Sequence, residues 1–386
     1  MQGLIAFLKV IVIGLGLFAH AVLAPFMPHS GVGTTTAPVE PAQVATSTSQ
    51  TPIAQEKSSK TATTATSVKP KQNPVASPQA SQRVAAQAIT PASVALPAAL
   101  PPSLSQSVVN EKARAALVNI LCITKGGGYL NPISGSGVMI ATGGIVLTNA
   151  HVGQYFLLRD YIVKDNVTCT IRTGSPAHET YTAKLLYLPP AWIDANASQL
   201  TAAEGEGTGE NDYAFLIITA MADGSALPQT VPALSMTVNE PFRGEPILIA
   251  SYPAQYLEGI TIEMNLYISS ALTTVQDIFA FTDAGTPDLM SVGNTIVSQA
   301  GSSGGAVVRI QDGALQGIVS TATEGNSTSA RELHAITLSH IDRSLRAAGQ
   351  GGIAALLTGN LAEKASTFAQ TTGLDEQKKL FDVLGK

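Results

Sequence analysis

The chain has 386 residues, a net charge of −5 and only 13% charged residues. That length accommodates one large domain or two ordinary ones. Because so few charges, mostly acidic, cannot build a basic face for a phosphate backbone, the composition argues against nucleic acid as a partner.

The first 27 residues predict an export signal or a membrane anchor. A lone Lys9 precedes an uncharged apolar run from Val10 to Phe18. The segment Ala19-His20-Ala21 fits the small-x-small pattern of a signal-peptidase site. If the segment stays uncleaved, Val10 to Met27 is long enough to cross a bilayer. In either case we expect the rest of the chain outside the cytoplasm, secreted or tethered to the membrane.

Residues 28–107 predict a disordered linker. The stretch is a mixture of Thr, Ser, Ala, Pro and Gln, and no aromatic residue occurs between Phe26 and Tyr129. Such a composition cannot bury enough apolar surface to offset the entropy lost on ordering.

Between Val118 and Thr337 the chain contains thirteen apolar runs of strand length with turn signals between them. Little helix separates them, which predicts an all-β fold rather than βαβ units. The runs divide near Asp223–Pro232, so we expect two packed antiparallel six-stranded β-barrels, the first over about 115–225 and the second over about 226–340. The predicted folded domain spans residues 108–349.

Helices are expected only at the edges of this domain. The stretch VNEKARAAL predicts a short helix before the first strand. LSHIDRSLRAA predicts a closing helix with Thr337 or Ser339 as its N-cap. Residues 350–386 predict weak helices, too short for a further domain, and their role cannot be read from the sequence.

Three polar residues at the ends of strand-like runs could together activate a nucleophile. His151 lies in GIVLTNAHV, Asp212 in ENDYAFLII and Ser303 in GSSGG. A serine hydroxyl attacks well only when a base takes its proton, and that base is usually oriented by a third group. Loops at strand ends can bring such residues together over a rigid scaffold.

Four segments resemble the trypsin-like (chymotrypsin-fold) serine proteases, and the resemblance is closest to the Deg-type bacterial branch. SGSGVMIATGGIVLTNAHV is similar to the family's histidine segment, and NDYAFLII to its aspartate segment. GSSGGAVV matches G-x-S-G-G, and LQGIVSTA matches the strand along one wall of the substrate cleft. Their order is the family's, and together they cover roughly 115–345. Several motifs in the right order are far more specific than any one of them.

The resemblance implies a serine endopeptidase that needs no cofactor or metal and acts on protein or peptide substrates. It assigns His151 as the general base, Asp212 as its orienting partner and Ser303 as the nucleophile. Ser302 would face away, because the third position of G-x-S-G-G carries the nucleophile. The amides of Gly301 and Ser303 would bind the oxyanion, and glycine at 301 permits the turn this requires.

The resemblance also implies a specificity pocket and a disulfide. Val297, six residues before the nucleophile, would form the pocket floor, and Ser320, Thr321 and Ala322 its wall. A pocket without a carboxylate cannot offset the desolvation of lysine or arginine, so we expect cleavage after small or medium apolar residues. Glu332 is the one acidic residue that could approach from the opposite strand. Cys122 and Cys169 would lie on neighbouring strands and form a disulfide outside the cytoplasm.

Some features depart from the family or leave alternatives open. The long stretch between His151 and Asp212 contains a second carboxylate, Asp194. No peptide-binding domain is recognisable after the protease, so a cage-like assembly is not expected, and the sequence does not indicate the oligomeric state. The six histidines and two cysteines form no metal-binding pattern.

Two other functions remain to be weighed. One is a trypsin-like fold without activity that binds a partner. The other is an esterase or lipase, since residues 301–305 also satisfy the nucleophile-elbow pattern G-x-S-x-G. Asp312 or Asp342 with His334 or His340 could nominally complete such a site. The elbow must lead into a helix, whereas GAVVRIQDGALQGIVS predicts strand, turn and strand.

Overall fold

The computed structural model describes residues 11–12, 104–125, 130–201, 205–206, 209–283, 285–322 and 332–385. The predicted signal or anchor segment, apart from two residues, and the predicted linker up to residue 103 therefore lie outside the described residues. Within the described ranges, no helix is both long and apolar enough to span a membrane.

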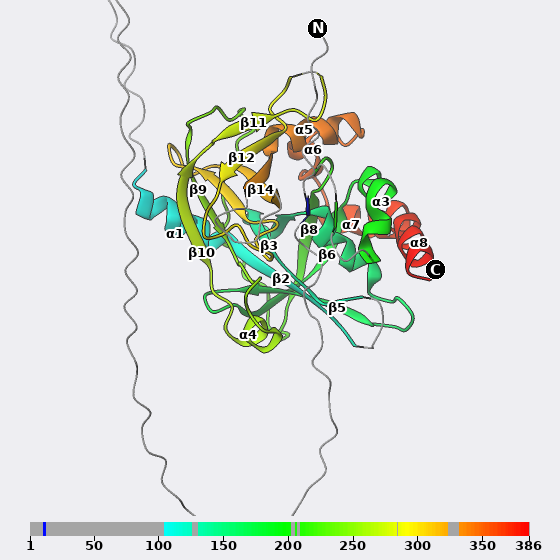
Figure 1. Ribbon diagram of the computed structural model, residues 1–386. Coiled ribbons are helices and arrows are strands. Elements are labelled where there is room, and N and C mark those ends of the chain that lie inside the picture. The colour runs from blue at the N-terminus through cyan, green and yellow to red at the C-terminus, as the bar shows by residue number, and fades with distance from the viewer. Residues whose placement is uncertain are drawn as a thin grey trace, which may run out of the picture. The chain divides into compact units, whose positions relative to one another are not determined.

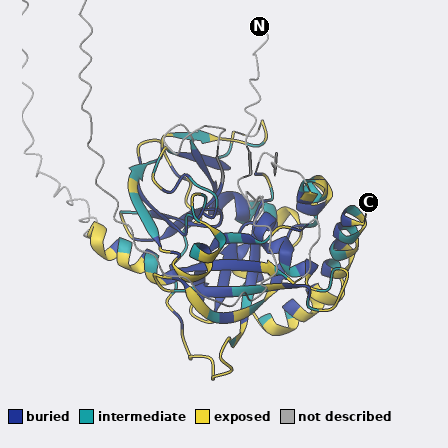
Figure 2. Ribbon diagram, turned by 60° about the horizontal axis from the view of Figure 1, so that its bottom comes forward, coloured by how far each residue is buried: buried dark blue, intermediate teal, exposed yellow. Residues whose placement is uncertain are grey.

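Six strands close into the first barrel, in the order β2-β3-β4-β8-β6-β5 (Figure 1). Small and β-branched residues fill its interior: a Cβ on Gly137 would meet the side chains of Val118, Ile120 and Val146. The barrel strands are mostly buried, as Figure 2 shows. They are β2 (Leu117–Thr124), β3 (Ile133–Ala141), β4 (Ile145–Thr148), β5 (Val167–Thr173), β6 (His178–Tyr187) and β8 (Ala214–Met221).

The second sheet is an antiparallel half-barrel with the order β10-β9-β13-β14-β15-β12-β11. Its path has seven strands and ends at β10 and β11, so the predicted closed six-stranded barrel is found only in the first half. Near the open side, Thr273 of β10 reaches Val292 of β12 through a side-chain hydrogen bond of 3.4 Å. The strands are β9 (Pro246–Ser251), β10 (Ser269–Thr274), β11 (Asp277–Phe279), β12 (Leu289–Gly293), β13 (Ala306–Arg309), β14 (Leu315–Ala322) and β15 (Leu333–Thr337).

Two very short strands join this sheet off its main path. β1 (Ile11–Val12), within the predicted signal or anchor segment, pairs with Ala322 of β14 and with β7 (Gly205–Glu206).

Two of the predicted strands take other forms. The front of ITIEMNLYISSAL contains the helix α4 (Gly259–Met264), and only its end belongs to β10. The run Asn294–Gln299 is a turn, and the strand lies just before it, at β12. Both runs contain β-branched and apolar residues, so their local pattern favours strands, and tertiary contacts override that preference.

Helices close the domain at both ends. α1 (Gln106–Ala116) precedes the first strand, and α5 (Leu338–Ala347) follows the last with Thr337 as N-cap, accepting from the N–H of His340. The C-terminal tail forms α6 (Ile353–Leu356), α7 (Leu361–Gln370) and α8 (Thr372–Leu384). α7 packs on β6 (Figure 1). α8 packs on two short 3₁₀ helices, η1 (Gln154–Leu158) and η2 (Ala197–Thr201). The tail is therefore part of the first barrel's outer layer.

Candidate active site

His151 and Asp212 come together because the strands that carry them are neighbours. Thr148, the last residue of β4, pairs with Ala214, the first residue of β8. His151 follows β4 in the one-turn helix α2 (Ala150–Gly153), and Asp212 comes just before β8. Strand pairing thus places the two side chains at the same end of the barrel.

The imidazole and the carboxylate are hydrogen-bonded in the interior. His151 Nδ1 lies 2.9 Å from Asp212 Oδ2 and 3.1 Å from Oδ1, and the His151 backbone N–H donates to Oδ1 at 3.0 Å. The two residues are 4% and 0% exposed. With Nδ1 facing the carboxylate, His151 Nε2 is left buried and without a hydrogen-bond partner in the described part of the chain. A neutral imidazole held this way can accept a proton at Nε2.

Further polar groups hold Asp212 from the other side. The Ser320 hydroxyl donates to Asp212 Oδ2 at 2.8 Å, and Asn149 Nδ2 donates to the Asp212 carbonyl at 2.9 Å. Asp212 is thus fixed through both its carboxylate and its backbone. Asp194, the alternative carboxylate, forms an ion pair with Lys379 of α8 on the surface. The geometry therefore favours Asp212 as the partner of His151.

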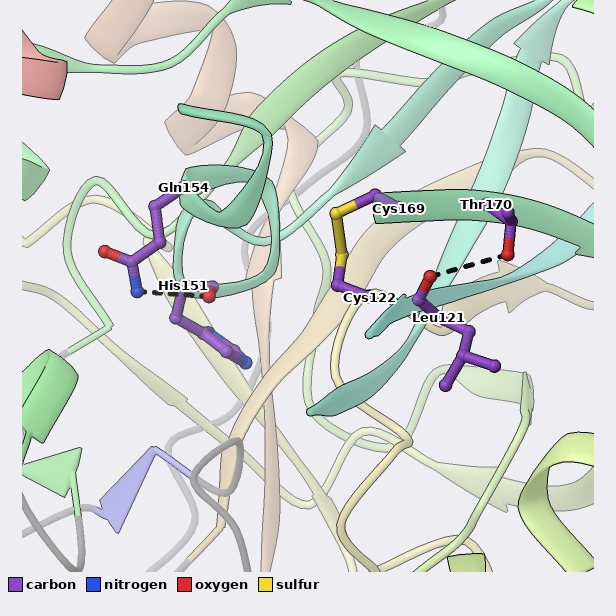
Figure 3. The surroundings of a disulfide bond; sticks show 6 residues. All are labelled: Leu121, Cys122, His151, Gln154, Cys169 and Thr170. Atoms are coloured by element: carbon purple, nitrogen blue, oxygen red, sulfur yellow. Dashed lines mark hydrogen bonds between the residues drawn. A yellow bond between two sulfur atoms is a disulfide. The ribbon is translucent and has the colours of Figure 1, made fainter. Parts of the chain in front are cut away.

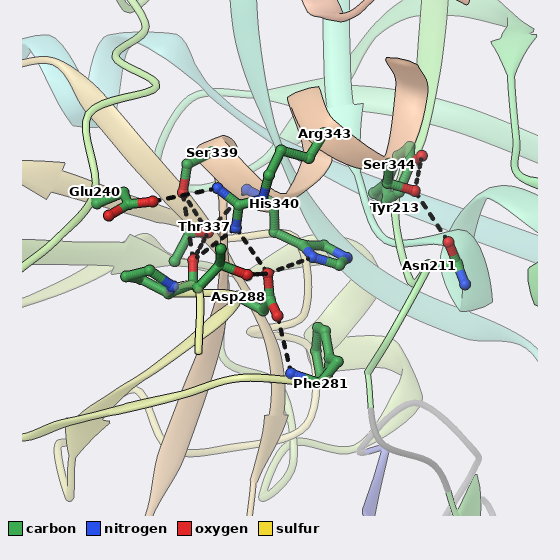
Figure 4. Close-up of polar contacts among 12 residues, drawn as sticks. Asn211, Tyr213, Glu240, Phe281, Asp288, Thr337, Ser339, His340, Arg343 and Ser344 are labelled. Atoms are coloured by element: carbon green, nitrogen blue, oxygen red, sulfur yellow. Dashed lines mark hydrogen bonds and ion pairs between the residues drawn. The ribbon is translucent and has the colours of Figure 1, made fainter. Parts of the chain in front are cut away.

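The residue before Asp212 adopts a left-handed backbone, and the closing helix supports it. Asn211 has φ +63°, a conformation that asparagine tolerates better than most residues. Ser344 of α5 donates to Asn211 Oδ1 at 3.1 Å and accepts from the Tyr213 hydroxyl at 2.9 Å (Figure 4). One hydroxyl of α5 thus bridges the two residues that flank Asp212.

Ser303 is brought to the same place by its neighbours. Gly304 donates its N–H to the Val319 carbonyl at 2.8 Å, and Val319 directly precedes Ser320, which contacts Asp212. The Ser303 carbonyl accepts from the N–H of Ser136 on β3 at 2.7 Å. Gly304 also lies against the first barrel, since a Cβ there would stand 2.6 Å from Thr148 Oγ1. The serine loop is therefore clamped between β14 and the strand end that precedes His151.

The two serines of the motif face different surroundings. Ser302 is fully buried, and its hydroxyl accepts from Ser251 at 2.9 Å. It is therefore engaged in the interior of the second sheet. This arrangement agrees with the expectation that Ser302 faces away from the reaction.

The peptides on both sides of Gly301 are held in place. The Ala300 carbonyl accepts from the N–H of Ala254 at 2.8 Å, and the Gly301 carbonyl accepts from Ser136 Oγ at 2.7 Å. Because C=O and N–H point in opposite directions across a trans peptide, the Gly301 N–H is directed away from Ala254. It makes no hydrogen bond to the described residues.

Glycine at 301 is required for two reasons. Its φ is +90°, and a Cβ would stand 2.6 Å from the Tyr252 carbonyl oxygen. Only a residue without a side chain fits that backbone and that space.

A comparison with protein families agrees with this geometry. Residues 135–318 match the family model described as the trypsin-like peptidase domain. The chain carries a trypsin-like peptidase domain. The match spans His151, Asp212 and Ser303 and does not separate the Deg-type branch from the rest of the family. No curated protein matches the chain.

The residues predicted to form the specificity pocket lie in different surroundings from one another. Val297 is fully buried in an apolar cluster with Val319, Leu333 and Ala335. The Ser320 hydroxyl donates to Asp212, so its side chain contacts the aspartate. The side chains of Thr321 and Ala322 lie outside the described part of the structure.

Glu332 does not share the face of β15 that covers Val297. It accepts a hydrogen bond from the Ser291 hydroxyl, next to the buried His334. Since side chains alternate along a strand, Glu332 and His334 lie opposite Leu333, which packs with Val297. The acidic residue is therefore directed away from the apolar cluster.

Cys122 and Cys169 form the expected pair. They stand opposite each other on β2 and β5 and are joined by a disulfide, with Cα atoms 4.0 Å apart (Figure 3). The same view includes His151 and Gln154, whose amide donates to the His151 carbonyl at 3.1 Å. Within the described residues, no group of three or more His, Cys, Asp or Glu side chains could hold a metal ion.

The residues that a nucleophile elbow would use have other roles. His340 Nδ1 lies 2.9 Å from Asp288, which Arg343 also contacts (Figure 4), and Asp342 pairs with Arg346. Ser303 is followed by the strand β13, not by a helix. This order of elements excludes the esterase or lipase fold.

The His340 cluster ties α5 to the second sheet. Burial lowers the pKa of His340, although Asp288 opposes this effect. Burial tends to raise the pKa of Asp288, but Arg343, the Phe281 N–H and His340 together hold it below its usual range. The neutral imidazole and the ionised carboxylate therefore keep α5, and with it Ser344, beside the Asp212 loop.

Three residues near the site escaped the sequence reasoning. Ser136, whose hydroxyl donates to the Gly301 carbonyl, lies in the histidine segment. Its small size was the only hint in the sequence that it lies close to another segment. Ser344 had none, because its partners are more than 100 residues away. Trp192, with its ring centroid 6.4 Å from that of His151, lies in a helix, α3 (Pro190–Asn196), within the stretch that departs from the family.

Proposed function

We propose that this protein is a serine endopeptidase that cleaves protein or peptide substrates through an acyl-enzyme intermediate. The observation that carries the proposal is the buried His151–Asp212 pair with the Ser303 loop clamped beside it. A peptidase domain of this kind needs a nucleophile, a base and an oxyanion site, and we assign these roles to Ser303, His151 and the amides of Gly301 and Ser303.

In the proposed reaction His151 Nε2 takes the proton of Ser303 Oγ as that oxygen attacks the substrate carbonyl. Asp212 holds Nδ1–H and stabilises the imidazolium that forms. The amides of Gly301 and Ser303 stabilise the oxyanion, at little reorganisation cost because both peptides flanking Gly301 are already fixed. The imidazolium then protonates the leaving amine, and water repeats the sequence to release the acyl group.

We further propose that the side chain before the cut bond is small or medium and apolar. The support is that Val297 packs among buried apolar side chains, while Glu332 contacts Ser291 on the other side of the strand. A lysine or arginine there would lose its hydration without gaining a partner charge.

We also propose that the reaction takes place outside the cytoplasm, with the chain secreted or held at the membrane by its N-terminal segment. The apolar N-terminal run supports this. The disulfide between Cys122 and Cys169 adds support, because such bonds persist in oxidising compartments.

A fluorophosphonate probe, followed by peptide mapping, tests the proposed nucleophile. Ser303→Ala should abolish labelling and peptide hydrolysis, since losing a triad member lowers turnover by many orders of magnitude. Ser302→Ala is the matched control. It leaves the Ser251 hydroxyl without its acceptor, at a cost of about 1–3 kcal/mol in stability, and should keep most of the activity.

Two outcomes would count against the assignment. If Ser302→Ala is inactive and Ser303→Ala is labelled, the register of the motif is wrong. If the folded wild-type protein is not labelled at all, the inactive, partner-binding fold becomes the better explanation.

A further inference from the structure

The C-terminal helices and the outside of the first barrel line a half-open cavity. It has a volume of about 720 Å³, within the range of sites that hold a small organic ligand. Its walls are β5, β6, α7, the start of α8 and the one-turn helix η1 (Gln154–Leu158). None of the residues proposed for catalysis lines it.

The cavity exists because α7 turns small residues toward the barrel. Ala362, Ala365 and Ala369 follow the i, i+3, i+7 spacing of one helix face, and all three line the hollow. Larger apolar side chains, including Leu185 and Phe368, complete the walls. The interior is therefore suited to an aliphatic chain.

The cavity offers little to a peptide backbone. β5 and β6 belong to the closed barrel, so neither presents an unpaired strand edge. The lining amides are also engaged, since Gln377 donates to the Leu157 carbonyl at 2.8 Å and Gln370 donates to Ser366 at 3.2 Å. A peptide would leave its own N–H and C=O groups unsatisfied there.

The charged residues of the lining favour an anion. Arg159 is paired with Asp160 and Asp165. Lys125 and Lys184 make no ion pair with any described residue. The lining holds three cations and two carboxylates, so its net charge is +1.

The phenol of Tyr155 adds a hydrogen-bond donor to the lining. Tyr155 is only 2% exposed and lines the cavity, and its hydroxyl makes no hydrogen bond within the described ranges. Burial raises the pKa of this phenol, so it stays a neutral hydrogen-bond donor. A neutral hydroxyl on the cavity wall can donate a hydrogen bond to a ligand oxygen.

We propose that this cavity binds a fatty carboxylate, with its alkyl chain along the alanine face of α7 and its carboxylate at Lys125 and Lys184. The alanine face of α7 and the apolar side chains beside it would remove part of the alkyl chain from water, which is favourable in proportion to the area buried. The lysines supply charge complementarity without a backbone edge. The proposal does not depend on the proposed protease activity.

Calorimetric titration of the full disulfide-bonded protein with dodecanoate, below its micelle concentration, tests the site. We expect saturable binding of one molecule per chain and a rise in Tm as ligand is added. Dodecan-1-ol, which keeps the chain and lacks the charge, should bind more weakly. The double substitution of Lys125→Met and Lys184→Met should weaken dodecanoate binding by about five- to tenfold. Lys112→Met, an exposed lysine of α1 outside the cavity, is the matched control.

A second pair of variants tests whether the ligand occupies the space beside α7. Ala369→Leu fills the hollow from an exposed helical position and should abolish binding, while Ala354→Leu, on α6 and outside the cavity, should not. The proposal is overturned if dodecanoate shows no saturable binding, or if the lysine variants bind it as well as wild type. It is also overturned if a short apolar peptide with a free C-terminus binds and dodecanoate does not.

Discussion

Gly304→Ala tests the idea that close contact between the two sheets positions the nucleophile. A Cβ at this residue would stand 2.0 Å from the Ser136 carbonyl oxygen and 2.6 Å from Thr148 Oγ1, and φ is +83°. Gly224 is the matched control. Its φ is +78°, yet nothing lies within 4 Å of its Cβ position.

The two substitutions separate backbone strain from packing. Both force alanine into the left-handed region, which costs about 1–2 kcal/mol. Only Gly304→Ala must also push β3 away from the serine loop, and such overpacking costs a further ~1–3 kcal/mol. We therefore expect losses of about 2–5 kcal/mol for Gly304→Ala and about 1–2 kcal/mol for Gly224→Ala.

Thermal unfolding and probe labelling measure the two effects. For a domain of this size, Gly304→Ala should melt roughly 2–12 °C below Gly224→Ala. Its labelling at Ser303 should fall even where it remains folded, because the hydrogen bond between Ser136 and Ser303 must lengthen. Equal losses of stability and unchanged labelling in the two variants would refute the reasoning.

Three further predictions concern pH, redox state and specificity. Burial lowers the pKa of His334, with Glu332 partly opposing it, and neither ring nitrogen has a partner in the described structure. As pH falls below about 6.5 the unfolded chain takes up this proton first, so the free energy of unfolding should fall, and His334→Leu should flatten the decline; an unchanged slope contradicts the assignment. The exported protein, denatured without reduction, should show no free thiol, since both of its cysteines lie in the disulfide. Two free thiols would show that the disulfide does not form. A mixed peptide library should be cut after Ala, Val or Leu, whereas dominant cleavage after Arg or Lys would refute the apolar pocket and make Glu332→Gln the next variant to test.

The residues proposed for chemistry could be found in the sequence because their surroundings are local. G-x-S-G-G needs its glycines for a turn that only glycine can make, and Gly301 and Gly304 both have positive φ. His151 and Asp212 stand at the ends of apolar runs, and strand pairing then brings them together. The strands of the first barrel could be predicted because each is an apolar run of strand length bounded by turn signals.

Tertiary structure decided what depends on contacts between distant segments. The β-branched, largely apolar runs at 260–264 and 294–299 form a helix and a turn, because tertiary contacts override the local preference for a strand. The second sheet is open, and a side-chain hydrogen bond rather than a strand pairing links β10 to β12.

The supporting residues were also hidden from any local pattern. Ser344 and Trp192 reach the site from a closing helix and from the stretch that departs from the family. The tail at 350–386 carried no readable role, yet it forms one wall of a cavity against the first barrel. Local periodicity determines which face of a segment is apolar. Only packing determines which other segment covers that face and where a hollow is left.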